Sequence, residues 1–335
     1  MSKRVIVVGG GLAGMQTALQ LKKYGLEPVI IEKSDVLGGK VNNWYLLFPS
    51  FTPAGEVVDR LRADVAQAQI ECLTSCEVED ISANSVRLAT GELLSCDAVV
   101  VASGFTLFDA KIKEEYGYGI YKNVYTTPDI EKMFIDGALP SGDAAPKRIA
   151  LLHCVGSRDE KVCQGHCSKV CCITGVKQAI ELKKQYPAAE IFNFYMDIRM
   201  FGAGYEELYR DAQISHNIHF VRGRISEAAP TIDNRIQIKA EDTLTARPLK
   251  MSVDMLILIV GMQANQSNSN WAKSAGLAQQ PSRFMKSVDH FLSNTSSSVE
   301  GIFYAGCVTA PKNIGESLND AMHAAQAVRD YLDKQ

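Results

Sequence analysis

The chain has 335 residues, of which 46% are hydrophobic and 22% charged, and these proportions are typical of a globular protein with two domains or one large one. The net charge of -3 excludes a strong electrostatic attraction to nucleic acid or to an anionic membrane, and no apolar run reaches the roughly 18 residues that a membrane-spanning helix needs. Because the N-terminus has no signal-peptide pattern and the nine cysteines are unevenly distributed, we expect a cytoplasmic protein in which clustered thiols bind a metal rather than form disulfides.

The start of the chain carries a glycine-rich motif of the type that binds a dinucleotide. An uninterrupted apolar run at residues 5–8 predicts a parallel strand covered on both faces. Gly9, Gly11 and Gly14 follow it in the spacing G-x-G-x-x-G. In this motif the glycines permit a tight turn, a close approach of the backbone to a pyrophosphate, and close packing of a helix on the strand. The motif therefore predicts dinucleotide binding at this turn.

A helix and a second strand complete the predicted βαβ unit. The helix is expected from about residue 12 to residue 24, with its N-terminus facing the phosphates, and Gly25 ends it. The segment PVIIEK is the second strand, and Glu32 stands at its end. An acidic side chain in this place accepts hydrogen bonds from ribose hydroxyl groups, so Glu32 is predicted to bind the nucleoside.

Three further segments resemble the superfamily of flavoproteins with two dinucleotide-binding domains. EKSDVLGGK, which contains Gly38, Gly39 and Lys40, resembles the segment that wraps the ribityl-pyrophosphate of FAD. CDAVVVASG resembles the strand that ends in an Ala-Thr-Gly-like turn, with Ser103 in place of threonine. VEGIFYAGCV resembles the C-terminal strand that ends in Gly-Asp. Here Cys307 replaces the aspartate that bonds a ribityl hydroxyl, although a backbone N–H can still serve.

This resemblance implies a thioredoxin-reductase-like α/β fold with a discontinuous FAD-binding domain. Residues 1–125 and 262–335 are expected to form that domain, and residues 126–261 an inserted Rossmann-like domain. A last helix at residues 316–332 would place its N-terminus near the flavin pyrimidine, where its partial positive charge favours a reduced, anionic flavin. Non-covalent FAD is expected to be bound by Gly9, Gly11, Gly14, Glu32, Lys33, Gly39, Lys40, Val78, Ala102, Gly104, Gly306, Cys307, Lys312 and Ser317.

The inserted domain begins like a second dinucleotide-binding unit but lacks its glycine turn. Residues 148–152 form an apolar strand, and ITGVKQAIELKKQY and AEIFNFYMDIRM predict the helix and the strand that follow. The turn between them begins Cys154-Val-Gly156-Ser-Arg158-Asp159 and keeps a single glycine. We therefore expect a cysteine-rich excursion in place of the phosphate turn, and NAD(P)H not to bind in the usual way.

Five of the nine cysteines lie in HCVGSRDEKVCQGHCSKVCC, residues 153–172. Buried core thiols and a redox disulfide are alternative interpretations, but the segment contains no C-x-x-C pair. An iron–sulfur cluster takes four thiolates, as zinc also can. Cys163, Cys167 and Cys171 are spaced by four and would share one face of a helix. A flavin nearby favours an electron carrier over a structural ion.

The cysteine segment closely resembles the A-type subunit of heterodisulfide reductase and its relatives. The likeness continues through YMDIRMFGAGYEELYRDA and VRGRISE to AGCVTAPKNIGESLNDAMHAA, and so covers essentially the whole chain. It implies an unusual [4Fe–4S] cluster near FAD, with Cys154, Cys167, Cys171 and Cys172 as ligands and Cys163 as the substitute. Neighbouring residues on a regular helix point about 100° apart, so Cys171 and Cys172 are expected to ligate together only if the backbone there is not helical.

The chain resembles a short bacterial form of this family, because it lacks the ferredoxin-type cysteine runs of the archaeal subunits. The resemblance implies an electron-transferring FAD/[4Fe–4S] subunit of a sulfur-oxidising heterodisulfide-reductase-like complex, with B- and C-type partners, no membrane insertion and a homodimeric state. Disulfide or sulfane chemistry would occur on the partners, so no catalytic residue is assigned. Alternatives are the flavoprotein subunit of a quinone-interacting oxidoreductase of sulfate reducers, a self-contained NAD(P)H-dependent reductase, and a non-catalytic scaffold that holds FAD and zinc.

Each of two basic residues has two alternative interpretations. Lys312 is either a neighbour of the flavin that stabilises its reduced anion or a solvated loop lysine. Arg199 either faces the flavin or the cluster or pairs with Asp197 or Glu206. His153 and His166 flank the predicted cluster ligands, and both are expected to support those ligands rather than bind iron.

Overall fold

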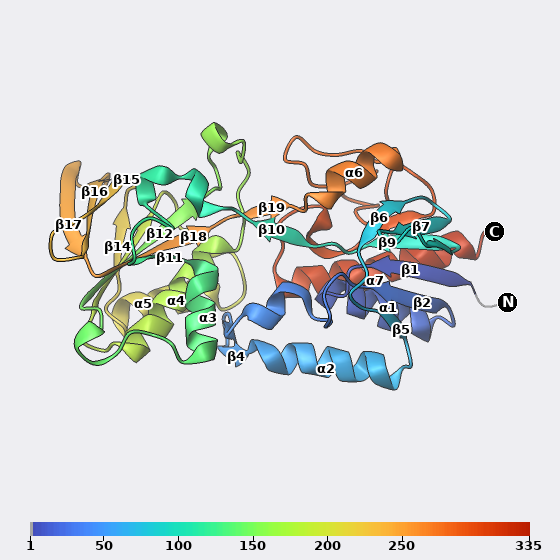
Figure 1. The fold of residues 1–335 in the computed structure, drawn as a ribbon, viewed down its shortest axis with the longest axis horizontal. Coiled ribbons are helices and arrows are strands. Elements are labelled where there is room, and N and C mark those ends of the chain that lie inside the picture. The colour runs from blue at the N-terminus through green and yellow to red at the C-terminus, as the bar shows by residue number, and fades with distance from the viewer. Residues whose placement is uncertain (1–2) are drawn as a thin grey trace. The chain divides into compact units, whose positions relative to one another are not determined.

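Parallel β-sheets form the centre of each of the two units into which the chain divides (Figure 1). The computed structural model describes residues 3–335. Unit 1 comprises residues 1–42, 54–106 and 263–335, and unit 2 comprises residues 43–53 and 107–262. Residues 43–53 and 107–125 thus group with unit 2, whereas the predicted FAD-binding domain includes them. The assignment of cofactors to domains stays a prediction.

The sheet of unit 1 has the strand order β20-β9-β1-β2-β5, and all of its pairs are parallel. The central strands β1 and β9 are fully or largely buried, because helices cover one face of the sheet and a small antiparallel sheet packs against the other, as the uninterrupted apolar run at residues 5–8 predicted. The strands are β1 (Arg4–Val8), β2 (Glu27–Ile31), β5 (Glu71–Leu73), β9 (Ala98–Val101) and β20 (Ile302–Tyr304).

The helices of unit 1 include α1 and α7, which pack against each other (Figure 1). The predicted first helix is confirmed: α1 ends before Tyr24, and Gly25 has a positive φ of 78°. The helices are α1 (Leu12–Lys23), α2 (Ala54–Gln67), α6 (Ser267–Ser274) and α7 (Ile314–Leu332), with the 3-10 turns η1 (Gly39–Asn43) and η6 (Gly306–Val308). A small antiparallel sheet adds β6 (Val78–Ile81), β7 (Ser85–Leu88) and β8 (Leu93–Ser95).

Unit 2 has its own parallel sheet, in the order β11-β18-β12-β13-β14. The strands are β11 (Val124–Thr126), β12 (Arg148–Val155), β13 (Glu190–Tyr195), β14 (His219–Arg222) and β18 (Met255–Val260). The helices are α3 (Thr127–Asp136), α4 (Cys171–Gln185) and α5 (Tyr205–Ile214). The order β12-α4-β13 confirms the predicted βαβ unit of the insert.

Shorter elements complete unit 2 and the passages between the units. Figure 1 shows β15 (Ile225–Pro230), β16 (Ile236–Asp242) and β17 (Arg247–Val253) as a separate antiparallel sheet. The hairpin of residues 43–53 contains β3 (Leu46–Leu47) and β4 (Thr52–Pro53). The others are β10 (Phe105–Leu107), β19 (Met262–Ala264), η2 (Ala110–Ile112), η3 (Glu114–Tyr116), η4 (Gly142–Ala144) and η5 (Glu160–Val162). Of the helices in residues 3–335, none combines the length and apolar character that crossing a bilayer requires.

Candidate dinucleotide and thiolate sites

The three motif glycines occupy the turn between β1 and α1, and they have different surroundings. Gly9 has a φ of 110°, and a β-carbon there would lie 2.5 Å from the Ala102 carbonyl oxygen. A β-carbon at Gly14 would lie 1.8 Å from the carbonyl oxygen of Gly9. At Gly11 a β-carbon would meet no heavy atom within 4 Å. Two of the glycines thus allow backbone packing, whereas Gly11 borders open space.

That open space lies at the N-terminus of α1. Gly11 is the N-cap of α1 and has no side chain to accept a hydrogen bond, and the first turn contains no acidic residue. The first backbone N–H groups of a helix lack intrahelical partners and carry a partial positive charge. The arrangement therefore suits an anionic group such as a pyrophosphate.

Glu32 is buried and braces the glycine turn. Its Oε2 accepts a hydrogen bond from the Gly10 N–H at 2.7 Å, and its Oε1 accepts one from the Ser34 N–H at 2.8 Å. The carboxylate thereby fixes the end of β2 against the turn. Its contact with a ribose stays a prediction.

The segment that follows β2 lies along the same turn. The Gly38 N–H donates to the Gly10 carbonyl oxygen at 2.8 Å, and a β-carbon at Gly39 would come within 3.1 Å of the Cα of Gly11. Lys40 stands over the Phe105 ring at 5.5 Å from its centroid. Burial, helped by the charge of the exposed Lys33, lowers the pKa of Lys40. Two lysines thus add positive charge beside the turn.

The predicted residues on the neighbouring strands are placed differently from one another. The Ala102 N–H donates to the Val8 carbonyl oxygen, which joins the end of β9 to β1. Gly104 has a φ of 67°, and a β-carbon there would meet nothing within 4 Å. The Val78 side chain is packed into the core of unit 1. Val78 therefore has only its backbone available for a ligand.

Cys307 and Lys312 point into the protein. The buried Cys307 thiol lies 3.5 Å from the Lys312 carbonyl oxygen and 3.7 Å from the Ser317 hydroxyl, and burial raises its pKa. Lys312 Nζ forms an ion pair with Asp320 and donates to the Gly306 carbonyl oxygen at 2.9 Å. The interpretation of Lys312 as a solvated loop lysine is therefore wrong, and its positive charge already has a partner. A flavin contact stays a prediction.

The N-terminus of α7 differs from that of α1 because it carries its own cap. The Asn313 side chain accepts a hydrogen bond from the Glu316 N–H at 2.8 Å, and the Glu316 carboxylate accepts one from the Asn313 N–H at 3.0 Å. The helix begins at Ile314, two residues before the predicted start. The carboxylate in the first turn offsets part of the positive charge that was expected to act on a flavin.

In unit 2, three of the predicted cluster ligands are buried at one place. Cys154 is the last residue but one of β12 and has a φ of 62°, and Cys171 and Cys172 are the first two residues of α4. The Cys171 thiol lies within hydrogen-bonding reach of both other sulfur atoms. Cys171 and Cys172 therefore lie in a helix and not in the non-helical backbone that joint ligation was expected to require, and their joint ligation stays a prediction. At a helix N-terminus there is no preceding turn, so both side chains can bend toward one neighbour.

Cys167 and Cys163 lie on the loop of residues 156–170 that connects β12 to α4. The half-buried Cys167 sulfur accepts a hydrogen bond from the Lys169 N–H at 3.3 Å. Cys163 is exposed and ends η5 with a φ of 56°. The idea that these cysteines share a helix face with Cys171 is wrong, because the spacing of four crosses irregular backbone.

The surroundings of the buried thiols favour the thiolate form at Cys154 and Cys172 but not at Cys171. Hydrogen bonding to Cys171 lowers the pKa of Cys154 to about 7 and the pKa of Cys172 to about 4, whereas hydrogen bonds to these two neighbours raise the pKa of Cys171. The α4 N-terminus has no side-chain cap and no acidic residue in its first turn. Three buried sulfurs lie together and the fourth predicted ligand lies on the adjoining loop, and thiolates are the donors that an iron–sulfur cluster takes.

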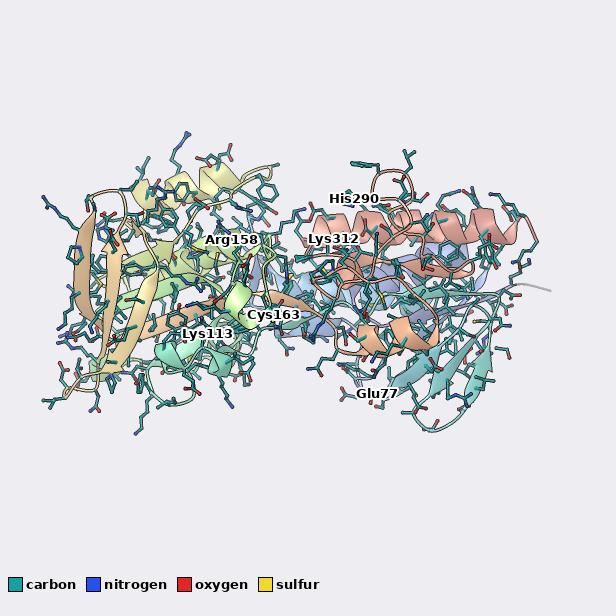
Figure 2. The ribbon with its side chains drawn as sticks, turned by 90° about the horizontal axis from the view of Figure 1, so that it is seen from above. Glu77, Lys113, Arg158, Cys163, His290 and Lys312 are labelled. Atoms are coloured by element: carbon teal, nitrogen blue, oxygen red, sulfur yellow. The ribbon has the colours of Figure 1, made fainter. Side chains whose placement is uncertain are left out.

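Arg158 and Asp159, which have no predicted role, fix this loop. Arg158 donates to Asp197 at 2.7 Å, and its charge acts on Cys154 and Cys167. Asp159 is buried between Lys113 and Arg224, each at 2.9 Å. Figure 2 shows Lys113, Arg158 and Cys163 around the loop. The run Ser-Arg-Asp-Glu directly after Gly156 was the available signal for them.

His153 lies behind the thiols and is buried. Its Nε2 is 3.0 Å from Asn193 Oδ1, and a β-carbon at Gly175 of α4 would come within 2.5 Å of its ring. Gly175 therefore allows the His153 ring to pack closely against α4. Within residues 3–335, no group of three or more His, Cys, Asp or Glu side chains is arranged to hold a metal ion. The cluster stays a prediction.

Comparisons with known proteins agree with this architecture. Residues 3–132 match the pyridine nucleotide-disulphide oxidoreductase family. The structure is similar to thioredoxin reductase from T. acidophilum, with a TM-score of 0.70 and 18% identity over 99% of both chains, and to that of Lactococcus lactis, with a TM-score of 0.70 and 16% identity over the whole of both. The solved structures show a fold with two Rossmann-type domains, and the family match covers residues 3–132.

The sequence relatives are more specific. The chain is 34% identical to the A-type subunit of the H(2)/formate:CoB-CoM heterodisulfide,ferredoxin reductase of Methanococcus maripaludis and 29% identical to the A-type iron-sulfur subunit of the CoB--CoM heterodisulfide reductase of Methanocaldococcus jannaschii. Both matches cover 98% of this chain and 64% of the relative, so the chain spans less than two thirds of their length. Nearly the whole of this chain is thus similar to a part of each of these A-type subunits.

The two relatives and this chain also differ in length within the matched region. They run over 420 and 423 positions, more than the 335 residues of this chain. The relatives therefore contain additional residues inside the matched region as well as outside it.

Proposed function

We propose that this chain is the FAD- and [4Fe–4S]-containing electron-transfer subunit of a heterodisulfide-reductase-like complex. The observation that carries the proposal is its homology to the A-type heterodisulfide reductase subunits over 98% of the chain. The uncapped N-terminus of α1, with open space at Gly11, supports FAD. The donor set at α4 supports a cluster held by Cys154, Cys167, Cys171 and Cys172.

Bound FAD would exchange electrons in ones or twos, and a bound cluster would pass them singly. The chain itself supplies position and charge. The first turn of α1 binds the pyrophosphate, and Glu32 holds that turn in shape. At the other site the α4 N-terminus and Arg158 stabilise negative charge on the thiolates. Disulfide or sulfane chemistry occurs on B- and C-type partners, in a cytoplasmic sulfur-oxidising complex.

A second candidate is a self-contained NAD(P)H-dependent reductase. The match to a pyridine nucleotide-disulphide oxidoreductase family and the order β12-α4-β13 favour it. Stopped-flow mixing with NADH and NADPH separates the two functions. Flavin reduction by NADH or NADPH within the time of one catalytic turnover would support the second candidate. Slow flavin reduction at every concentration of NADH and NADPH would support the first. A quinone-interacting complex is distinguished by identifying the proteins that copurify anaerobically.

Serine variants test the cluster directly. After anaerobic reconstitution, Cys154→Ser, Cys167→Ser, Cys171→Ser and Cys172→Ser should each lose iron and retain FAD, because the flavin binds through a different unit. Cys163→Ser is the matched control and should keep both. Iron, acid-labile sulfide and flavin are measured in each variant. Full iron retention in Cys172→Ser with loss in Cys163→Ser would overturn the ligand set, and stoichiometric zinc without iron in the wild type would overturn the electron-transfer function.

A further inference from the structure

Unit 2 buries three charged side chains away from the thiols. Glu131 of α3 and Lys177 and Glu181 of α4 each expose at most 4% of their side chains. Charged residues are rarely buried this deeply unless every charge has a partner. Two carboxyl groups and one ammonium group leave this set one positive charge short of neutrality.

The two carboxyl groups have unequal surroundings. Glu131 Oε1 accepts hydrogen bonds from Lys177 Nζ at 2.6 Å and from Gln178 Nε2 at 2.8 Å, and its Oε2 accepts one from the Tyr45 N–H at 2.8 Å. Both oxygens of Glu131 thus act as hydrogen-bond acceptors, and three donors surround this carboxyl group. Neither oxygen of Glu181 has a hydrogen-bond partner among the described residues, although Lys177 Nζ lies 3.3 Å away. The proton that would make this set of three groups neutral therefore belongs on Glu181.

The groups around Glu181 agree with this assignment. Burial raises the pKa of Glu181 to about 8, against the opposing charge of Lys177 and with the help of Glu131; Lys184 is the remaining charged neighbour. The titratable tyrosines of the same core keep their protons, because burial raises the pKa of Tyr125, Tyr186 and Tyr209.

The same charged groups hold the hairpin of residues 43–53. Glu131 accepts from the Tyr45 N–H, and Lys177 Nζ donates to the Leu46 carbonyl oxygen at 2.9 Å. An ionised Glu181 would compete with Leu46 and Glu131 for Lys177. The hairpin attachment is thus strongest when Glu181 is neutral.

We propose that Glu131, Lys177 and Glu181 form a buried proton-binding site in which Glu181 accepts the proton. While the proton is bound, this site holds residues 43–53 against α3 and α4. The proton comes from solvent and returns to it. The site is independent of the proposed cofactors, because it lies outside the residues that would hold them.

Infrared spectroscopy of the full-length protein tests the proton. At neutral pH the wild type should show the carbonyl-stretching band of a protonated carboxylic acid, which disappears as the pH is raised through about 8. Glu181→Gln should lack the band, and Glu207→Gln, at an exposed carboxylate of α5, should keep it. If no buried-acid band is present in the wild type at neutral pH, the proposal is overturned, whether or not the variants fold.

Hydrogen exchange tests the attachment. After correction for intrinsic exchange rates, protection of peptides covering residues 43–53 should fall several-fold in the wild type between about pH 6 and about pH 9.5. In Glu181→Gln it should stay constant, because glutamine is neutral throughout. Equal pH dependence in the two proteins would overturn the role in fastening the hairpin. The infrared band and the hydrogen-exchange protection can both be interpreted whether or not the protein is purified with FAD and iron, because the proton site lies outside the proposed cofactor sites.

Discussion

A β-carbon at Gly11 would meet no heavy atom within 4 Å, whereas one at Gly14 would lie 1.8 Å from the Gly9 carbonyl oxygen. The same motif therefore leaves open space at one position and packs backbone against backbone at the other. Gly11→Val should fold and lose FAD, because its side chain fills the space beside the uncapped helix N-terminus. Gly14→Ala should be destabilised by about 1–3 kcal/mol or more, because helix and strand must separate.

Thermal unfolding and flavin content after denaturing extraction check this pair. Retention of stoichiometric FAD by Gly11→Val would contradict the assignment of the turn. Unchanged stability of Gly14→Ala would contradict the packing argument.

Lys177 illustrates the cost of a buried charge at the residue scale. Lys177→Met removes the positive partner of Glu131, and a buried carboxylate without its partner should reduce the free energy of unfolding by about 3–5 kcal/mol. Lys132→Met is the control, because Lys132 forms an exposed pair with Asp136 on α3, and its loss should change stability by at most about 0.5 kcal/mol. Denaturant unfolding measures both, and similar losses in the two variants would contradict the buried pair.

At the scale of elements, α4 joins the thiol site at its first turn to the proton site farther along. Glu181 titrates near its ordinary value of 4.5 when the chain is unfolded, and its pKa is about 8 in the fold. Between these pH values the folded state holds a proton that the unfolded state has released. This group therefore lowers stability as the pH rises through the window, by up to about 1.4 kcal/mol per pH unit, and has no further effect above it.

Glu181→Gln should remove this slope. The pH dependence of unfolding, measured from about pH 5 to about pH 9 by denaturant titration, should be flatter in the variant, which should be the more stable protein at the alkaline end. A parallel displacement of the two curves would mean that Glu181 keeps its ordinary pKa in the fold.

At the scale of the whole molecule, we predict a homodimer from the resemblance to the A-type heterodisulfide reductase subunits. Light scattering of the isolated, FAD-loaded protein should give about twice the chain mass of 36.7 kDa. The purified complex should contain B- and C-type subunits. A monomer mass across the accessible concentration range would contradict self-association but not the electron-transfer function, because partner proteins can bind a monomer.

The sequence by itself determined the α/β class, the position of the glycine turn and the limits of α1, because each depends on local spacing: an apolar run, three glycines, and a helix closed by Gly25. It also placed the thiols on one segment. Only the tertiary structure decided that Cys154, from the end of β12, reaches Cys171 and Cys172, since that contact joins a strand to a helix across an irregular loop. The proton site was likewise beyond local patterns, because Glu131 lies on α3 and meets Lys177 and Glu181 only when the two helices pack. Glu181 looks like any helical glutamate in the sequence, and its burial near Glu131 in the fold raises its pKa.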